Sequence, residues 1–197
     1  QIRSSAASDV YKRQGYALLK RLGDIAMASI GIVVLSPVML LLYGLIRLES
    51  PGNPIFVQKR VGAGGGEFTM YKFRSMVASA EGDGAKFASQ NDNRITRLGA
   101  IMRKTRLDEL PQLFNVLAGS MSMIGPRPDQ KALVDDLAAA IPLYRFRHVI
   151  RPGITGWAQV MQGYADDVAS TDVKLSYDLV YIKNLSLMMD FVICFNK

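Results

Sequence analysis

The most pronounced pattern in the chain is an apolar stretch over residues 25–46, which contains no charged side chain. A helix needs about 20 such residues to cross the hydrocarbon core of a bilayer, so this length suffices for a membrane segment and exceeds that of most buried core helices. Lys20 and Arg21 precede the stretch, and Arg47 and Lys59 follow it. Basic residues on both sides weaken the positive-inside signal for a spanning orientation.

Ser36 and Pro37 lie at the centre of this apolar stretch. A proline cannot donate to the carbonyl group four residues earlier, here that of Val33, and its ring pushes against that group, so the helix should kink or break. The Ser36 hydroxyl can satisfy the carbonyl, which lipid would leave unpaired. Two interpretations stay open: a spanning helix with a modest kink, and a broken, re-entrant helix that returns to the side it entered from.

After the turn cluster at 51–54, polar and apolar residues alternate as in β-strands over Ile55–Val61 and Glu67–Phe73. The glycine-rich residues 62–66 join them, which predicts a β-hairpin. A phosphate-binding loop is disfavoured, because no Lys-Ser/Thr pair follows and the dinucleotide fingerprint fails at Glu67. The small, polar residues 79–92 predict a loop.

The remaining pattern is mainly helical, so the fold class is predicted to be α+β with a small β-hairpin. Residues 94–106 form a basic amphipathic helix that lies either in the membrane interface or on an ordinary solvated surface. Further helical stretches are predicted within residues 129–147 and at residues 174–184, and the latter is expected to be the last helix. A rigid loop is predicted at residues 151–157. Residues 1–14 have no apolar period and are interpreted as a non-native leader, which leaves 15–50 as the membrane segment.

The composition limits the binding partners and the kinds of active site that the chain can have. The formal net charge of +7 calls for an anionic partner such as nucleic acid, anionic lipid or a phosphate-bearing substrate. The uncharged membrane stretch argues against nucleic acid. Cys194 is the single cysteine and His148 the single histidine, which excludes a Cys/His zinc site and a disulfide framework and makes a Ser-His-Asp triad improbable.

The strongest local signal for chemistry is the pair Asp108 and Glu109. Pro111 fits the first turn of a helix, so a helix should begin near Asp108, where the carboxylate would cap amide groups and stay ionised. Such a carboxylate can attack phosphorus, Arg103 can bind phosphate nearby, and Glu109 can hold a metal ion or move a proton. The alternative is a structural capping aspartate beside a solvated glutamate.

Arg74 and Arg127 are further candidates for phosphate binding. Each stands beside residues typical of a strand end or a turn, which would fix the guanidinium group in space. The alternative is that both are ordinary surface arginines.

The sequences of these motifs and their order along the chain resemble those of the bacterial sugar transferases, also called monotopic phosphoglycosyl transferases. The resemblance runs from about residue 19 to 190 and includes Ser36-Pro37, PIFVQKRVG at 54–62, KFRSM at 72–76, RITRLG at 94–99, LDELPQL at 107–113, GPRP at 125–128 and RPGITGW at 151–157.

This resemblance implies a re-entrant hairpin at Ser36-Pro37, interfacial helices, and a catalytic domain over residues 51–197 on the cytoplasmic side of the bacterial inner membrane. It implies that Asp108 attacks the β-phosphate of a UDP-sugar and releases UMP, and that polyprenyl (undecaprenyl) phosphate then removes the phosphosugar from Asp108. Glu109 would assist a magnesium ion, and Arg103 and Arg127 would bind phosphate or nucleotide. The reaction would begin the synthesis of exopolysaccharide, O-antigen or another glycoconjugate.

Two other functions compete with this one. A non-enzymatic module that binds anionic lipid explains the charge and the apolar segment but leaves the Asp108-Glu109 pair without a role. An enzyme that transfers the phosphosugar directly would use Asp108 only to bind metal.

Overall fold

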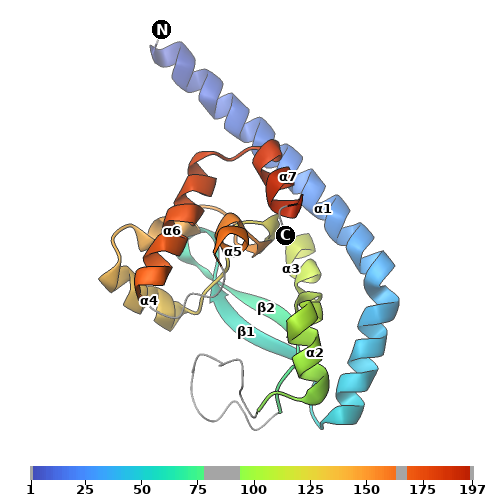
Figure 1. Ribbon diagram of the computed structural model, residues 1–197. Coiled ribbons are helices and arrows are strands. Elements are labelled where there is room, and N and C mark those ends of the chain that lie inside the picture. The colour runs from blue at the N-terminus through green and yellow to red at the C-terminus, as the bar shows by residue number, and fades with distance from the viewer. Residues whose placement is uncertain (1, 78–93, 163–167, 196–197) are drawn as a thin grey trace.

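The computed structural model describes residues 2–77, 94–162 and 168–195. A long helix, α1 (Ile2–Glu49), bows along one side of the molecule, and the other elements gather on its inner side (Figure 1). The predicted loop at 79–92 lies outside the described residues. The predicted leader, residues 1–14, is helical from Ile2 onward and continues into α1.

Helix α1 is continuous through Pro37, so the prediction of a broken helix is wrong for this structure. The physical reason lies one residue earlier, where Ser36 Oγ donates a hydrogen bond of 2.8 Å to the carbonyl oxygen of Val33. That carbonyl is the one that proline leaves without its amide partner. The predicted role of the serine is therefore confirmed, and it allows the helix to bend without unwinding.

The two faces of α1 differ in how deeply their side chains are buried. Within the described residues, its part Gly15–Glu49 is long and apolar enough to cross a membrane, yet only 11% of the most apolar window is buried. Val33 and Leu40 on the outer face are 73% and 72% exposed, whereas Ala28 and Ile46 on the inner face are almost fully buried. A core helix of a soluble protein would be buried on all sides, so the outer face of α1 needs an apolar environment.

Polar contacts fasten α1 to the rest of the chain just before its apolar stretch. Arg21 donates from Nη1 to the carbonyl of Val116 (2.6 Å) and from Nη2 to that of Leu117 (2.9 Å). Asp24 is 2% exposed and accepts hydrogen bonds from the hydroxyl of Ser122 (3.1 Å) and the amide of Met123 (3.0 Å). The polar part of α1 is thus an integral part of the folded domain.

The predicted hairpin is confirmed with its bounds. Strands β1 (Ile55–Val61) and β2 (Glu67–Phe73) pair antiparallel, with Ile55 opposite Phe73. The short helix η1 (Ala63–Gly65) closes the turn, where Gly64 and Gly65 adopt φ values of 71° and 80°. Glycine adopts this left-handed region without the strain that a side chain would bring.

A second, parallel pair was not predicted. Strands β3 (Ser122–Ile124) and β4 (Gly153–Thr155) lie side by side, so the predicted rigid loop 151–157 contains a strand. A Cβ atom on Gly153 would lie 2.1 Å from the backbone nitrogen of Gly125, which explains the two glycines. This contact fixes the chain just before Arg127.

Most of the remaining chain is helical, which confirms the α+β, mainly helical fold class. The α-helices are α2 (Arg97–Thr105), α3 (Gln112–Ala118), α4 (Lys131–Ala140), α5 (Trp157–Met161), α6 (Val168–Lys183) and α7 (Leu187–Phe195), and the 3-10 helices η3 (Leu107–Glu109) and η4 (Tyr144–His148).

Several helix bounds differ from the prediction. The helix predicted at 94–106 begins only at Arg97, because Thr96 caps it by accepting a bond of 2.9 Å from the Gly99 amide. The helical stretch predicted within 129–147 is confirmed as α4, and η4 follows it. The helix predicted at 174–184 is the C-terminal part of α6, but α7 comes after it, so it is not the last helix.

Two core clusters lie between the hairpin and α1. Phe73 packs with Leu42 and Ile46 of α1 and Met102 of α2. Met70 of β2 belongs to a second cluster, with Ala28, Leu113, Val116 and Met121. The hairpin, α2 and α3 are therefore held directly against α1.

Candidate active site

The pair Asp108 and Glu109 lies in a sharp connection between α2 and α3. Helix α2 ends where Arg106 adopts the left-handed conformation, with a φ of 57°, and η3 follows at once. A non-glycine residue in this region is uncommon and strained, and such strain is often found at functional sites. The prediction that Asp108 caps a helix is wrong, because α3 begins only at Gln112 and its cap position, Pro111, makes no side-chain bond.

Glu109 is buried and paired with two cations. Its Oε1 atom accepts hydrogen bonds from Arg127 Nη2 (2.7 Å) and Lys72 Nζ (3.2 Å). Burial by itself would raise the pKa of Glu109, but the two cations outweigh it and lower the pKa to about 2. Glu109 is therefore ionised at neutral pH and serves to hold Arg127 and Lys72 in place, which makes it unsuited to carry a proton.

Asp108 is half-buried and, within the described residues, forms no hydrogen bond or ion pair. Burial raises its pKa above the ordinary value, and the neighbouring charge of Glu109 adds to this. The cations Lys72, Arg127 and Arg103 lower the pKa without cancelling the rise. The sequence predicted a carboxylate kept ionised by a helix end, whereas in the structure burial raises the pKa of Asp108 and three cations oppose that rise.

The structure brings together four of the five predicted catalytic and phosphate-binding residues. Arg103 in the last turn of α2 and Arg127 after β3 both act on the charge of Asp108. Arg103 is half-buried and has no hydrogen-bond partner among the described residues. Its guanidinium group is thus available to a ligand that approaches Asp108.

Arg74 lies apart from this group. It is 9% exposed, and its Nη2 atom donates to the carbonyl (2.7 Å) and the hydroxyl (2.8 Å) of Ser50, just after α1. Arg74 therefore fastens the end of the hairpin to the end of α1. Its role in phosphate binding stays a prediction.

Sequence reasoning missed Asn115 and gave no role to Lys72, although Lys72 opens the KFRSM motif. The buried side chain of Asn115 in α3 accepts from the amide of Tyr71 (3.0 Å) and donates to the carbonyl of Thr69 (2.6 Å). This amide clamp fixes β2 against α3 and so places Lys72 beside Glu109. An asparagine between the apolar residues Leu113 and Val116 was the available signal.

Arg147 holds the loop that carries Arg127. It is 3% exposed and donates from Nε (3.1 Å) and Nη2 (2.8 Å) to Asp178, and from Nη2 to the backbone carbonyl of Arg127 (3.1 Å). A further ion pair joins it to Asp129. The backbone position of Arg127, and with it the contact to Glu109, depends on this buried network.

Residues 15–197 match the family described as bacterial sugar transferase. The chain belongs to the bacterial sugar transferase family.

Three relatives illustrate the range of this family. The chain is 53% identical, over 91% of its length and 43% of the relative's, to the UDP-N-acetylgalactosamine-undecaprenyl-phosphate N-acetylgalactosaminephosphotransferase of Aeromonas hydrophila. It is 43% identical to the UDP-glucose:undecaprenyl-phosphate glucose-1-phosphate transferase of Xanthomonas campestris pv. campestris, over 89% of its own length and 37% of the relative's. It is 41% identical to the exopolysaccharide production protein PSS of Rhizobium leguminosarum bv. phaseoli, over 90% and 92% of the two lengths. The chain thus spans about two fifths of the first two relatives.

A magnesium site in this bacterial sugar transferase would need help from its substrate. Within the described residues, no three His, Cys, Asp or Glu side chains gather as a metal site. Mg²⁺ is commonly bound by one or two carboxylates together with substrate phosphates. The Asp108 carboxylate and Glu109 Oε2 suit that arrangement, since the described contacts of Glu109 use only Oε1.

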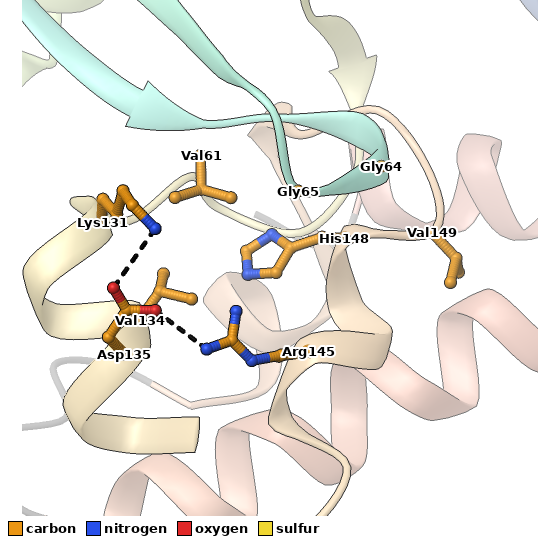
Figure 2. Close-up of a pocket in the computed structure, with 9 residues that line it drawn as sticks. All are labelled: Val61, Gly64, Gly65, Lys131, Val134, Asp135, Arg145, His148 and Val149. Carbon is orange, nitrogen blue, oxygen red and sulfur yellow. Dashed lines mark hydrogen bonds and ion pairs between the residues drawn. The ribbon is translucent and has the colours of Figure 1, made fainter. Parts of the chain in front are cut away.

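A cavity of about 290 Å³ lies away from this pair, between the tip of the hairpin, α4 and η4 (Figure 2). The His148 ring points into it, and Asp135 pairs at its edge with Lys131 (3.3 Å) and Arg145 (2.9 Å). Burial and the charge of Arg147 lower the pKa of His148 to about 4, so the ring is neutral at neutral pH. None of the predicted site residues lines this cavity.

Proposed function

We propose that this chain transfers a sugar 1-phosphate from a UDP-sugar to undecaprenyl phosphate, through a covalent phosphosugar intermediate on Asp108. The observation that carries the proposal is the half-buried Asp108 carboxylate, which has no partner among the described residues and is surrounded by Arg103, Arg127 and Lys72. A carboxylate left free amid cations suits attack on a phosphate that those cations bind. The relatives' names supply the acceptor and the class of donor.

The two steps balance without an added reactant. An Asp108 oxygen bonds to the β-phosphorus, the bond from that phosphorus to the bridging oxygen breaks, and its electrons leave with UMP. An oxygen of undecaprenyl phosphate then attacks the same phosphorus, and the bond to Asp108 breaks, which restores the carboxylate. Bound Mg²⁺, held by Asp108 and Glu109, would neutralise charge on the diphosphate.

The surrounding cations stabilise the charge that develops during transfer. Arg103 and Arg127 approach Asp108 from α2 and from the loop after β3, so they lie on different elements around the reacting phosphate. Glu109 fixes Arg127 and Lys72 before the substrate arrives, which reduces reorganisation during the reaction.

The position of α1 supports a membrane-surface enzyme with both flanks of the apolar stretch on the cytoplasmic side. Before the stretch, Arg21 and Asp24 bond to α3 and β3. After it, Ser50 accepts from Arg74. Because both flanks contact one folded domain, a helix with its two ends on opposite sides of the bilayer is disfavoured.

The test is to mix purified protein with UDP-N-acetylgalactosamine or UDP-glucose in the presence of Mg²⁺ and the absence of lipid acceptor. We expect at most one UMP per protein and a mass increase on Asp108. Asp108→Asn should abolish both and leave the melting temperature nearly unchanged. UMP release only in the presence of acceptor would favour direct transfer, and an active Asp108→Asn protein would exclude Asp108 as the nucleophile. Binding to anionic vesicles with no UMP release at all would favour the lipid-binding module.

A further inference from the structure

The cavity between the hairpin tip, α4 and η4 lies at the other end of the hairpin from Asp108 and Glu109 (Figure 2). Val61, which lines the cavity, pairs with Glu67 at the first residue of β2. Lys72, which binds Glu109, lies five residues further along β2, roughly 17 Å away at the spacing of an extended strand. The cavity is therefore separate from the site around Asp108.

A buried ring nitrogen in this cavity lacks a partner. His148 is 8% exposed, its ring points into the cavity, and its Nε2 atom forms no hydrogen bond with any described residue. A buried polar atom without a partner destabilises a fold, so a nitrogen of this kind beside a cavity indicates that a bound molecule completes it. The ring is uncharged at neutral pH, and a neutral imidazole has one donor and one acceptor nitrogen. It therefore suits an uncharged hydrogen-bonding group.

The mouth of the cavity presents both donors and acceptors. The Asp135 carboxylate accepts from Lys131 Nζ (3.3 Å) at Oδ2 and from Arg145 Nη2 (2.9 Å) at Oδ1. Further N–H groups on both cations, and further lone pairs on the carboxylate, are not used in contacts between described residues. An anion entering the cavity would be repelled by Asp135 and would have to displace it from the cations. A neutral ligand meets no such obstacle.

Apolar side chains and bare backbone complete the walls. Val61 and Val134 are buried members of one core cluster, and Val149 lines the cavity from the residue after η4. Gly64 and Gly65 at the hairpin tip contribute backbone only, and a Cβ atom on either would meet no atom within 4 Å. The volume of about 290 Å³ lies near the lower end of the range for ligand sites, so it suits a ligand the size of one sugar ring.

We propose that this cavity binds one sugar ring, a neutral ligand rich in hydroxyl groups, at a site separate from Asp108. Hydroxyl groups both donate and accept, so they can bond the His148 ring, Asp135 and Arg145 without changing the charge of any of them. The carbon face of the ring packs on the apolar wall, as is usual in pockets with few polar groups. The inference does not depend on the proposed function, because binding in the cavity requires no transfer at Asp108.

The test uses His148 itself as the reporter. It is the single histidine of the chain, so its ring gives a signal of its own in NMR spectra of protein labelled on histidine and purified without a histidine tag. The sugar probes are glucose and N-acetylgalactosamine as free rings and maltose as a ring joined to a second one. UDP and inorganic phosphate are the probes for a nucleotide and for an anion.

Asp135→Asn tests the mouth of the cavity. Asp136→Asn is the matched control, because Asp136 is the next residue of α4, is exposed and does not line the cavity. Both variants keep His148 as the reporter. Both should melt nearly as the wild type does, because the ion pairs of Asp135 are screened by solvent.

A free sugar should shift the His148 signal to saturation, with a Kd of about 0.1–10 mM, as expected for so small a ligand. Asp135→Asn should weaken this binding by about 10-fold, the usual effect of losing a hydrogen bond to a charged group, and Asp136→Asn should bind as the wild type does. UDP should not displace the sugar. Tighter binding of maltose would identify the ligand as the end of a glycan, and tighter binding of a free ring would identify a monosaccharide.

Four results would overturn the proposal. The first is a His148 signal that no sugar shifts, and the second is a saturable shift with inorganic phosphate alone, which would indicate an anion site. The third is displacement of the sugar by UDP, which would make the cavity part of the donor site. The fourth is equal sugar binding by Asp135→Asn and the wild type, which would remove the mouth of the cavity from the binding site.

Discussion

Arg147 offers a sharp test of how the site is supported. Its guanidinium group is 3% exposed and bonds Asp178, which is 1% exposed, as well as Asp129 and the carbonyl of Arg127. Arg147→Met would leave the buried Asp178 carboxylate without its ion-pair partner. Removing one partner of a buried ion pair destabilises a protein by about 3–5 kcal/mol, because the remaining charge stays uncompensated.

For a chain of this size, each kcal/mol lowers the melting temperature by about 2–4 °C, so a fall of roughly 6–20 °C is expected. Thermal unfolding in detergent, followed by tryptophan fluorescence, measures it. Arg145→Met is the matched control, because Arg145 lies two residues away and pairs with the exposed Asp135. That pair is screened by solvent, so the control should melt nearly as the wild type does.

A second variant separates the buried charge from packing. Arg147→Met combined with Asp178→Leu removes both charges of the pair and should recover much of the lost stability. If Arg147→Met and Arg145→Met melt alike, or if the double variant melts lower than Arg147→Met alone, the reasoning about an uncompensated carboxylate is refuted.

Two further predictions concern pH and topology. The pKa of His148 is about 4 in the folded protein, below its unfolded value of 6.5, so the unfolded chain binds a proton first as the pH drops, and stability falls between these two values. His148→Gln should reduce this loss of melting temperature at low pH. Equal losses in the variant and the wild type would contradict the reasoning. Cysteines at Ala17 and Lys59, in a Cys194→Ser background that removes the exposed native thiol, should react with an impermeant reagent from the cytoplasmic side only; labelling from opposite sides would show a spanning helix.

The elements that could be predicted from the sequence are those with a local cause. The hairpin Ile55–Val61 and Glu67–Phe73 follows from alternation around a run of glycines, and the structure reproduces its bounds. The pair β3 and β4 escaped prediction because three residues per strand are too few to show a period. The sequence left two interpretations of α1 open, because a single serine hydroxyl decides whether Pro37 breaks or only bends the helix.

The candidate site likewise has one part that a local motif predicts and another that depends on contacts between distant residues. The motif around Asp108 and Glu109 indicates the reacting carboxylates, but the pairing of Glu109 with Lys72 joins residues far apart in the sequence. That pairing depends on the amide clamp of Asn115, which no local pattern predicts. The raised pKa of Asp108 likewise depends on burial, which follows from the packing of η3 against β2 and α2.

Helix α1 and the turn that carries Asp108 and Glu109 form a single packed unit. Leu42 and Ile46 of α1 share one cluster with Met102 before the catalytic pair, and Leu107 and Leu110 on either side of the pair pack against it. Removal of α1 would therefore take away the support beneath Asp108, as well as the exposed apolar surface on the outer face of the helix. Since the two contacts belong to opposite faces of one helix, the proposed function would have the distance of the Asp108 carboxylate from a bilayer set by side-chain packing, so that a lipid-linked acceptor would meet it at a fixed depth.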